Sequence, residues 1–428
     1  MKSIWNDIEK PKFDTLEEDI KTDVLIIGGG MCGLLCAYML KNEGVDCVLV
    51  EADEICRGIT NGTTAKITFQ HGLIYDKITK KYGHEKAYLY YKSQKEAFEK
   101  LAELASDSDL EFGNSFVYSR TDREVIEKEV DALNKIGCNA VFCKNTELPF
   151  DIAGAVMVEN QANFHPLKFA YSISKNLKIY ENTKVIELNP HSAITDKGII
   201  RAKKVIVATH FPFINKHGGY FLKMYQHRSY VLALRNAQNL KGMYVDEAKD
   251  GLSFRNYGDL LLLGGGSHRT GSSGGNWREL QNFAQKYYPD SRETQKWATQ
   301  DCMTLDSIPY IGKYSKSTPD LYVATGFNKW GMTSSMVAAK ILTDMIIGRK
   351  SEYEELYSPS RSILHPQLAV NMFESVKGLI TPTAPRCPHM GCALKYNREE
   401  HSWDCPCHGS RFQENGKLIN NPATEGKN

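Results

Sequence analysis

Two short groups of cysteine and histidine near the end of the chain have the side chains and spacing to bind iron or zinc. They read Cys387-Pro-His389-Met-Gly-Cys392 and Cys405-Pro-Cys407-His408. Thiolates and imidazoles in this proportion bind a tetrahedral zinc ion, or a two-iron two-sulfur cluster in which imidazoles replace the thiolates on one iron. The segment is therefore a candidate metal centre.

A glycine-rich turn near the start of the chain has the spacing of a dinucleotide-binding site. Gly28, Gly30 and Gly33 follow the apolar run 23–27. This spacing permits a tight turn, lets the backbone approach a pyrophosphate, and packs a helix against its strand. Glu51 ends the next apolar run, where it can accept a ribose hydroxyl and would repel a 2′-phosphate. The pattern predicts a nucleotide cofactor.

A second loop favours FAD over NAD as that cofactor. Residues 57–66 are rich in glycine, threonine and cationic side chains, which suit the pyrophosphate and ribityl chain of FAD. The candidate contacts in this loop are Arg57, Thr63, Thr64 and Lys66.

The charge of the chain argues against a nucleic acid or an anionic membrane as partner. Lys and Arg total 53 against 51 Asp and Glu, and the formal net charge is +2. A small molecule or a protein therefore fits better as a partner. The amino terminus lacks a cationic segment followed by an apolar one, so we expect a cytoplasmic protein.

One apolar stretch has nearly the length of a membrane span. Residues 24–40 are apolar or glycine, but three consecutive glycines lie within them. Each glycine costs ~1 kcal/mol relative to alanine in a helix interior, so a turn is favoured. The sequence therefore predicts no membrane span.

The elements that would position these motifs begin with a β-α-β unit. Strands are predicted over 23–27 and 46–50, with a helix over 33–42 between them. This unit predicts a parallel sheet covered by helices on both faces. The alternating runs between 225 and 266 instead predict an antiparallel sheet in a second lobe.

The expected fold class is α/β, within a multidomain α+β architecture. A Rossmann-like FAD-binding domain carries an inserted antiparallel-sheet substrate domain, followed by a small, mainly-β cluster-binding subdomain. The expected boundaries are 20–80, 150–215 and 300–348 for the discontinuous FAD-binding domain, 81–149 and 216–299 for the substrate domain, 349–384 for a connector, and 385–428 for the cluster segment.

The first 350 residues resemble the D-amino-acid oxidase and glycine oxidase superfamily of FAD-dependent oxidoreductases. The resemblance covers roughly residues 20–348 and is carried by the loop 57–66, Ala208-Thr209 and the run 324–333. It implies that the turn after the last strand places backbone amides near the flavin ring. The residues of that turn are Gly326, Phe327, Trp330, Gly331, Met332 and Thr333.

The same resemblance implies oxidation of a carbon–nitrogen bond by hydride transfer to the flavin, with the substrate held by the second lobe. The polar candidates on that lobe are Tyr225, His227, Arg228, Tyr230, Arg255, Tyr257 and His268. A substrate carboxylate would favour an arginine fork, so Arg228 and Arg255 are the first catalytic candidates and Tyr257 is a third. These side chains could also face solvent.

The cysteine and histidine groups resemble the Rieske family. The resemblance implies that Cys387, His389, Cys405 and His408 are cluster ligands and that Cys392 and Cys407 form a disulfide. Matching glycine, proline and serine neighbours favour a Rieske centre over zinc. The segment is short for such a domain, so we expect it to pack on the flavoprotein with the connector as its platform.

Together the motifs predict an FAD-dependent dehydrogenase of an amine or amino acid. Histidine ligation raises the cluster potential to roughly −150 to +300 mV, so the cluster can take electrons from reduced flavin and pass them to an external acceptor. Two alternatives remain open: an oxidase that uses dioxygen, and an electron-transfer module without its own small substrate. A Rieske oxygenase is disfavoured because no helical histidine pair is present to bind a mononuclear iron.

Overall fold

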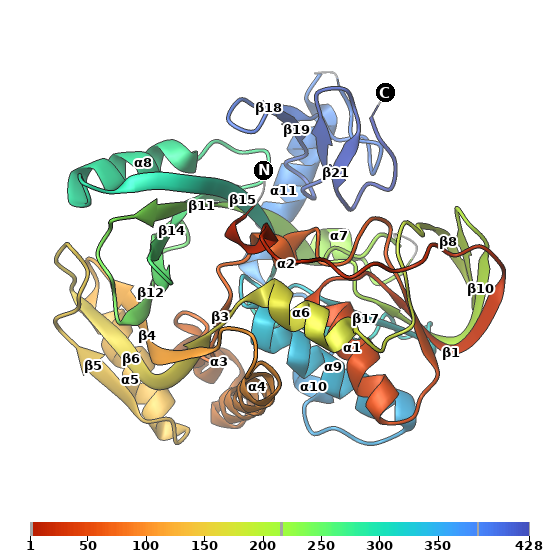
Figure 1. Cartoon of the computed structure of the whole chain (residues 1–428), viewed down its shortest axis with the longest axis horizontal. Helices are drawn as coiled ribbons and strands as arrows, with labels where there is room; N and C mark the ends of the chain where they lie inside the picture. The colour runs from red at the N-terminus through yellow and green to blue at the C-terminus, as the bar shows by residue number, and fades with distance from the viewer. Residues whose placement is uncertain (1–2, 215–216, 383–384, 428) are drawn as a thin grey trace.

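The computed structural model describes residues 3–214, 217–382 and 385–427 (Figure 1). It contains an eight-stranded sheet, a nine-stranded sheet and a small four-stranded sheet. Residue 384, the expected end of the connector, and residue 428 lie outside the described residues. In the described ranges, none of the helices combines the length and the apolar character needed to cross a bilayer.

The eight-stranded sheet forms the nucleotide-binding domain. Its main path has the order β16-β17-β10-β1-β2-β7, and the pairs β17–β10, β10–β1, β1–β2 and β2–β7 are parallel. The strands are β1 (Ile20–Ile27), β2 (Cys47–Val50), β7 (Ile179–Tyr180), β8 (Val185–Asn189), β9 (Ser192–Thr195), β10 (Ile199–Val207), β16 (Tyr310–Lys313) and β17 (Leu321–Thr325).

Two apolar helices pack against each other beside this sheet. α1 (Met31–Asn42) follows β1, and α9 (Gly331–Ile347) follows β17. Both helices are buried over most of their length, which explains the long apolar run at 24–40 without a membrane span. The adjoining short helices are α2 (Ile59–Gly62) and α6 (Pro166–Ser174), with the 3-10 turn η1 (Ile4–Asn6).

The nine-stranded sheet forms the second lobe, where a substrate is expected and which is therefore called the substrate lobe. Its main path has the order β15-β11-β14-β13-β12-β4-β6-β3, and β5 pairs with β6. The strands are β3 (Lys66–Ile67), β4 (Glu111–Ser119), β5 (Ala140–Cys143), β6 (Gly154–Asn163), β11 (Met224–Arg235), β12 (Gly242–Asp246), β13 (Ser253–Tyr257), β14 (Leu260–Arg269) and β15 (Arg292–Thr304). Its helices are α3 (Ile74–Tyr82), α4 (His84–Leu104), α5 (Arg123–Lys135) and α8 (Asn276–Tyr287).

This sheet corrects the expected domain boundaries at three places. Strands β3, β6 and the end of β15 fall in ranges expected to belong to the FAD-binding domain, but they pair within the nine-stranded sheet. The reason is the long-range antiparallel pairing of β6 with β4 and of β15 with β11. Such pairing depends on register between distant segments, which a local pattern does not encode.

The last part of the chain is tied to the flavoprotein before it forms the cluster segment. Arg361 pairs with Asp306 through two nitrogens, 2.8 Å each, and also donates to main-chain carbonyls. The remaining elements are α7 (Tyr220–Lys223), α10 (Glu354–Tyr357), α11 (Pro366–Ile380), β18 (Lys395–Asn397), β19 (Ser402–Asp404), β20 (Arg411–Gln413) and β21 (Leu418–Asn420). The segment thus has a small sheet of its own and also uses α11 of the connector as a platform.

Candidate active site and cluster site

A large cleft opens between the two main sheets and has a volume of about 1860 Å³. Its walls include Gly28 after β1, Ser229 of β11 and Asn421 of the cluster segment. Small-molecule pockets commonly measure about 300–1,000 Å³. The cleft therefore has room for a dinucleotide together with a substrate.

The glycine turn leaves the amino terminus of α1 open to this cleft. Gly28 has φ +113°, and a Cβ there would lie 2.6 Å from the carbonyl oxygen of Ala208. A Cβ at Gly33 would lie 1.9 Å from the carbonyl oxygen of Gly28. Gly30 caps the helix without a side-chain hydrogen bond. The Met31 amide donates to the Thr60 hydroxyl at 3.0 Å, and Gly30, Met31 and Cys32 line the cleft. The positive end of the helix dipole at this position would attract a pyrophosphate.

Glu51 lies at the end of β2, beside the glycine turn. Its carboxylate accepts hydrogen bonds from the backbone amides of Gly29 (2.7 Å) and Asp53 (3.0 Å). Burial raises the pKa of this carboxyl, and these amides oppose the shift. A carboxylate oxygen can accept more than one hydrogen bond, so the position still fits a ribose hydroxyl.

Most of the other predicted FAD contacts also line the cleft. They are Arg57, Thr63, Thr64, Lys66, Ala208, Thr209, Phe327, Trp330, Gly331 and Met332. Gly33, Gly326 and Thr333 lie behind its surface: the Thr333 hydroxyl, for example, donates to the carbonyl of Thr68 at 3.1 Å. Burial, with the nearby Arg255 charge, lowers the pKa of Lys66 to about 7.

His71 is held by the protein itself. Its Nδ1 lies 2.7 Å from the Tyr90 hydroxyl, and its Nε2 lies 2.9 Å from the Thr68 carbonyl and 3.0 Å from the Thr333 hydroxyl. Its ring also stacks on Trp330. His71 therefore supports the turn that precedes α9.

Two of the three catalytic candidates do not line the cleft. Arg255 is fully buried and donates to the carbonyls of Thr64 (2.7 Å) and Ala65 (3.0 Å). The Tyr257 hydroxyl donates to Asp109 at 2.8 Å. Arg255 therefore braces the loop that carries the predicted FAD contacts, and Tyr257 holds Asp109. We assign neither side chain a contact with a substrate.

The third candidate, Arg228, is already paired. Its Nε donates to Oε1 of Glu400 at 3.0 Å, and its Nη2 pairs with the other carboxylate oxygen. Tyr230 (3.0 Å) and Arg411 (2.8 Å) donate to the same carboxylate. Glu400 lies in the turn between β18 and β19, so Arg228 fastens the cluster segment to the substrate lobe. This pairing corrects the expectation that Arg228 is available to a substrate carboxylate.

Sequence reasoning did not single out two charged residues in the cleft, Asp301 and Lys329. Asp301 lies directly opposite His227 in the β11–β15 pair, and Lys329 precedes α9. Burial raises the pKa of Asp301 to about 6 and lowers the pKa of His227 to about 2. The alternation of β15 is the signal that could have found Asp301, once its register with β11 was known.

The cysteine and histidine groups form a compact, buried centre. Cys387, Cys405 and His408 are at most 2% exposed, and the rings of His389 and His408 lie 5.0 Å apart. Both ring nitrogens of His408 are buried and have no hydrogen-bond partner among the described residues, and burial lowers the pKa of this imidazole to about 3. A neutral imidazole with free nitrogens fits a metal ligand.

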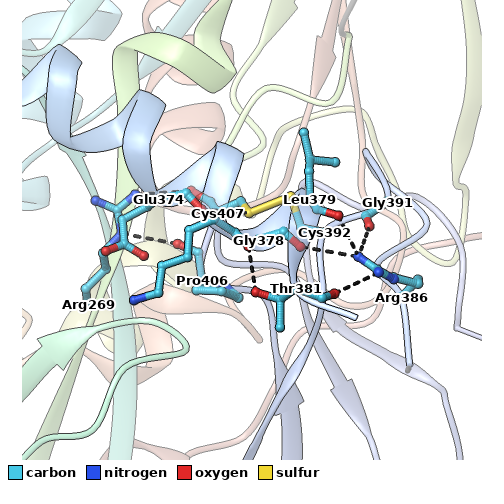
Figure 2. The surroundings of a disulfide bond; sticks show 11 residues. Arg269, Glu374, Gly378, Leu379, Thr381, Arg386, Gly391, Cys392, Pro406 and Cys407 are labelled. Atoms are coloured by element: carbon cyan, nitrogen blue, oxygen red, sulfur yellow. Dashed lines mark hydrogen bonds between the residues drawn. A yellow bond between two sulfur atoms is a disulfide. The ribbon is translucent and has the colours of Figure 1, made fainter. Parts of the chain in front are cut away.

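The two remaining cysteines form the disulfide that the Rieske resemblance implied. Cys392 is bonded to Cys407, and Gly378 of α11 packs directly on this bond (Figure 2). The sulfur atoms of Cys392, Cys405 and Cys407 lie within 4.8 Å of one another. Because two of these are joined, the thiols left to bind a metal are those of Cys387 and Cys405.

The second cluster loop packs against the substrate-lobe sheet. Gln226 of β11 donates to the carbonyls of His408 and Asn421, each at 2.9 Å. Gln300 of β15 donates to the carbonyl of Gly409 at 2.9 Å and also to Gln226. Figure 1 shows the cluster segment, in blue, lying over these strands. The sheet therefore separates the cleft from the cluster loop.

Arg269 of β14 holds the same loop from the side. It donates to the carbonyls of Pro406 (3.2 Å) and Cys407 (3.3 Å), as Figure 2 shows for Pro406. A Cβ at Gly271 would lie 2.7 Å from Pro406, so only glycine permits this approach. The loop is thus seated by buried polar contacts on three neighbouring strands.

Two protein families account for nearly the whole chain. Residues 23–345 match the family described as FAD dependent oxidoreductase, and residues 345–427 match the Rieske [2Fe-2S] domain. The chain belongs to the FAD-dependent oxidoreductase family. It carries a carboxyl-terminal Rieske domain, so its cofactors are FAD and a two-iron two-sulfur cluster.

Relatives share this combination or its flavoprotein part. A Bacillus subtilis Rieske 2Fe-2S iron-sulfur protein, YhfW, is 32% identical over 478 aligned residues, which cover 96% of this chain and 94% of YhfW. The gamma-glutamylputrescine oxidoreductase of Escherichia coli is 24% identical over 80% of this chain and 87% of its own.

Solved structures of this family have the same fold. L-proline dehydrogenase from P. horikoshii superposes with a TM-score of 0.67 at 18% identity, covering 81% of this chain and 98% of its own. Glycine oxidase from Geobacillus kaustophilus also gives a TM-score of 0.67 at 18% identity, covering 80% of this chain and 99% of its own.

Proposed function

We propose that this protein is an FAD-dependent dehydrogenase of an amine or amino acid that passes electrons through its Rieske cluster to an external acceptor. In this proposal Cys387, His389, Cys405 and His408 bind the cluster. The residues of the glycine turn, the 57–66 loop and the turn before α9 bind FAD. The acceptor is a separate molecule, and the protein works in the cytoplasm.

The observation that carries the proposal is the position of the cluster loop on the reverse side of the cleft wall. Gln226 and Gln300 hold the loop, while His227 and Asp301, their neighbours on the same strands, line the cleft. Side chains alternate across a strand, so only one layer of backbone separates the two sites. Bound FAD would supply a hydride acceptor that can release electrons singly to a cluster of suitable potential.

The substrate class is supported by relatives. The matched proteins include an L-proline dehydrogenase, a glycine oxidase and a gamma-glutamylputrescine oxidoreductase. Each of these names contains an amine or amino acid. The cytoplasmic location is supported by seven unpaired cysteines among the described residues, apart from Cys387 and Cys405 of the proposed cluster site, since free thiols are usual in a reducing compartment.

Anaerobic reduction tests the proposal. Iron-replete protein is mixed with individual amines and amino acids, and flavin absorption is followed together with the electron paramagnetic resonance of the reduced cluster. We expect flavin bleaching and then a Rieske signal from one class of substrate. Bleaching without any cluster signal would refute the electron route, and hydrogen peroxide at full turnover in air would favour an oxidase, as the similarity to glycine oxidase would suggest.

A further inference from the structure

The cleft face of the substrate lobe carries polar side chains that the protein itself leaves unsatisfied. Within the described residues, the Asp301 carboxylate has no hydrogen-bond or ion-pair partner. His227, directly opposite on β11, is 8% exposed and its Nδ1 has no hydrogen-bond partner. Buried polar groups are nearly always hydrogen-bonded, so the unpaired His227 Nδ1 indicates a ligand in the cleft. The half-buried Asp301 carboxylate beside it is free to meet the same ligand.

Lys329 brings a positive charge to the same face. It has φ +72°, and the preceding Asn328 has φ +53°. A left-handed conformation is strained for residues other than glycine, and such strain is concentrated at functional sites. The Lys329 ammonium lies 3.5 Å from the Ser267 hydroxyl and 3.5 Å from the Lys249 carbonyl, at the outer limit of a hydrogen bond. The strained turn thus holds a weakly paired ammonium in the cleft.

We propose that Asp301 binds the substrate ammonium and accepts its proton, and that Lys329 binds the substrate carboxylate. The substrate is then an α-amino acid, primary or secondary at nitrogen. This inference rests on the proposed function. Arg228, the expected carboxylate-binding residue, is not available because it is paired with Glu400.

The step balances in protons and electrons. A proton leaves the substrate nitrogen for the Asp301 carboxylate, and the nitrogen gains a lone pair. Bound FAD would accept the α-hydrogen together with the electron pair of its C–H bond, while the nitrogen lone pair forms a C=N bond. The substrate is oxidised to an iminium by two electrons, FAD is reduced by two, and Asp301 later returns its proton to water.

The surroundings of Asp301 suit this role. Burial raises its pKa to about 6, and the charges of Lys329 and Arg228 oppose that shift. His227 is kept neutral by burial and by nearby cations, so it adds no charge to the site. A general base is most effective when its pKa lies near the working pH. Asp301 is therefore largely ionised, and able to take a proton, at neutral pH.

The test compares Asp301→Asn, Asp301→Glu and Lys329→Met with wild type by anaerobic stopped-flow reduction of the bound flavin. Glycine, L-proline and N-methylglycine are the amino-acid probes, and putrescine is the amine without a carboxylate. Asp290→Asn, an exposed position beyond α8, is the matched control. We expect Asp301→Asn to slow flavin reduction by about 10²–10⁴-fold. We expect wild type to lose rate below about pH 6 and Asp301→Asn not to show this loss, whereas Asp301→Glu should restore part of the rate.

A binding measurement without turnover distinguishes the role of Lys329 from the role of Asp301. Pyrrole-2-carboxylate has the carboxylate but no ammonium, and its binding is followed by the perturbation of flavin absorption. Lys329→Met should weaken this binding about 10-fold or more, the usual range for a hydrogen bond to a charged group. Asp301→Asn should not weaken it. Equal weakening in both variants would indicate a merely structural role and overturn the assignment.

Three further results would distinguish a failure of this inference from a failure of the proposed function. If wild type is reduced by an amino acid but Asp301→Asn keeps its rate and its acid limb, the inference fails and the proposed function stands. If putrescine reduces the flavin and the amino acids do not, the carboxylate-binding role fails. If no probe reduces wild-type flavin, the proposed function fails together with the inference.

Discussion

The two faces of one pair of strands, β11 and β15, differ in how completely their polar groups are satisfied. On the cleft face, the described part of the chain offers no hydrogen-bond partner to the His227 Nδ1 or to the Asp301 carboxylate. On the reverse face, the amides of Gln226 and Gln300 are hydrogen-bonded to the cluster loop and to each other. The reverse face therefore has a permanent partner within the protein, whereas the cleft face leaves groups free for the ligand that we propose.

The same contrast explains why alternate residues of a strand have separate roles. Gln300 and Asp301 are neighbours in the chain but point to opposite sides of the sheet. A substitution on one face should therefore affect one site and spare the other. Substitutions on the two faces should reveal this separation, and the largest effect is expected at the cluster ligands.

Removing a cluster ligand should abolish the cluster and leave the flavin site intact. Cys405→Ser replaces a proposed thiolate ligand that is 1% exposed at the reverse side of the sheet. We expect complete loss of iron and of the Rieske electron paramagnetic resonance signal, with normal flavin content. Cys143→Ser, in β5 of the substrate lobe, is the control. A retained Rieske signal would exclude Cys405 as a ligand.

Breaking the ion pair across the interface should loosen the cluster segment. Arg228→Met leaves Glu400 buried with Arg411 as its remaining cationic partner. Removal of one member of a buried ion pair costs about 3–5 kcal/mol. We expect a lower free energy of unfolding and faster proteolysis in the 349–384 connector.

The control for this change is Arg235→Met, which breaks an exposed ion pair at the end of β11. The double variant Arg228→Met with Glu400→Gln should recover part of the stability, because no unpaired charge then remains. If the single variant is as stable as Arg235→Met, Arg228 does not fasten the segment.

A substitution of Gln226 should slow only the transfer of electrons from the flavin to the cluster. Gln226→Leu removes the donor to the carbonyls of His408 and Asn421, each left buried at a cost of about 1–3 kcal/mol. We expect normal reduction of the flavin by substrate and slower appearance of the reduced-cluster signal. Ser229→Ala, on the cleft face of the same strand, should show the reverse pattern. Equal effects of both variants on both steps would contradict the two-face separation.

The smallest expected effect is on the pH dependence of the free energy of unfolding. The pKa of Asp301 is raised by burial to about 6, above its usual value near 4, so the folded state binds more protons between these values. Stability conferred by protonation is therefore lost as pH rises through 6. Asp301→Asn should be more stable than wild type at pH 7–8 by on the order of 1 kcal/mol, with the gain vanishing near pH 4. A thermal melting series at both pH values measures this, and a gain that persists at pH 4 would refute the explanation.

Local motifs were predictable because their chemistry depends on near neighbours in the chain. The glycine turn, the strand at 321–325 and the disulfide between Cys392 and Cys407 all agree with the expectations from sequence. For the glycine turn and the strand a few neighbouring residues determine the conformation, whereas the disulfide was implied by the resemblance to the Rieske family. The family comparisons confirm the same two cofactors.

The catalytic candidates were less predictable because their roles depend on distant segments. Arg228, Arg255 and Tyr257 were selected for their type, but the structure pairs each of them with another part of the protein. Asp301 was overlooked because nothing near it in the chain marks it as a site residue. Its place in the cleft follows only from the pairing of β15 with β11.

The amino-acid sequence alone thus determined which cofactors this protein binds and where their binding motifs lie. Tertiary structure decided which side of the substrate-lobe sheet each polar residue faces, and therefore whether it meets a substrate or the cluster segment. The physical reason is the period of two along a strand: a shift of one residue in register would exchange the two faces. That register is set by pairing between strands more than fifty residues apart in the chain.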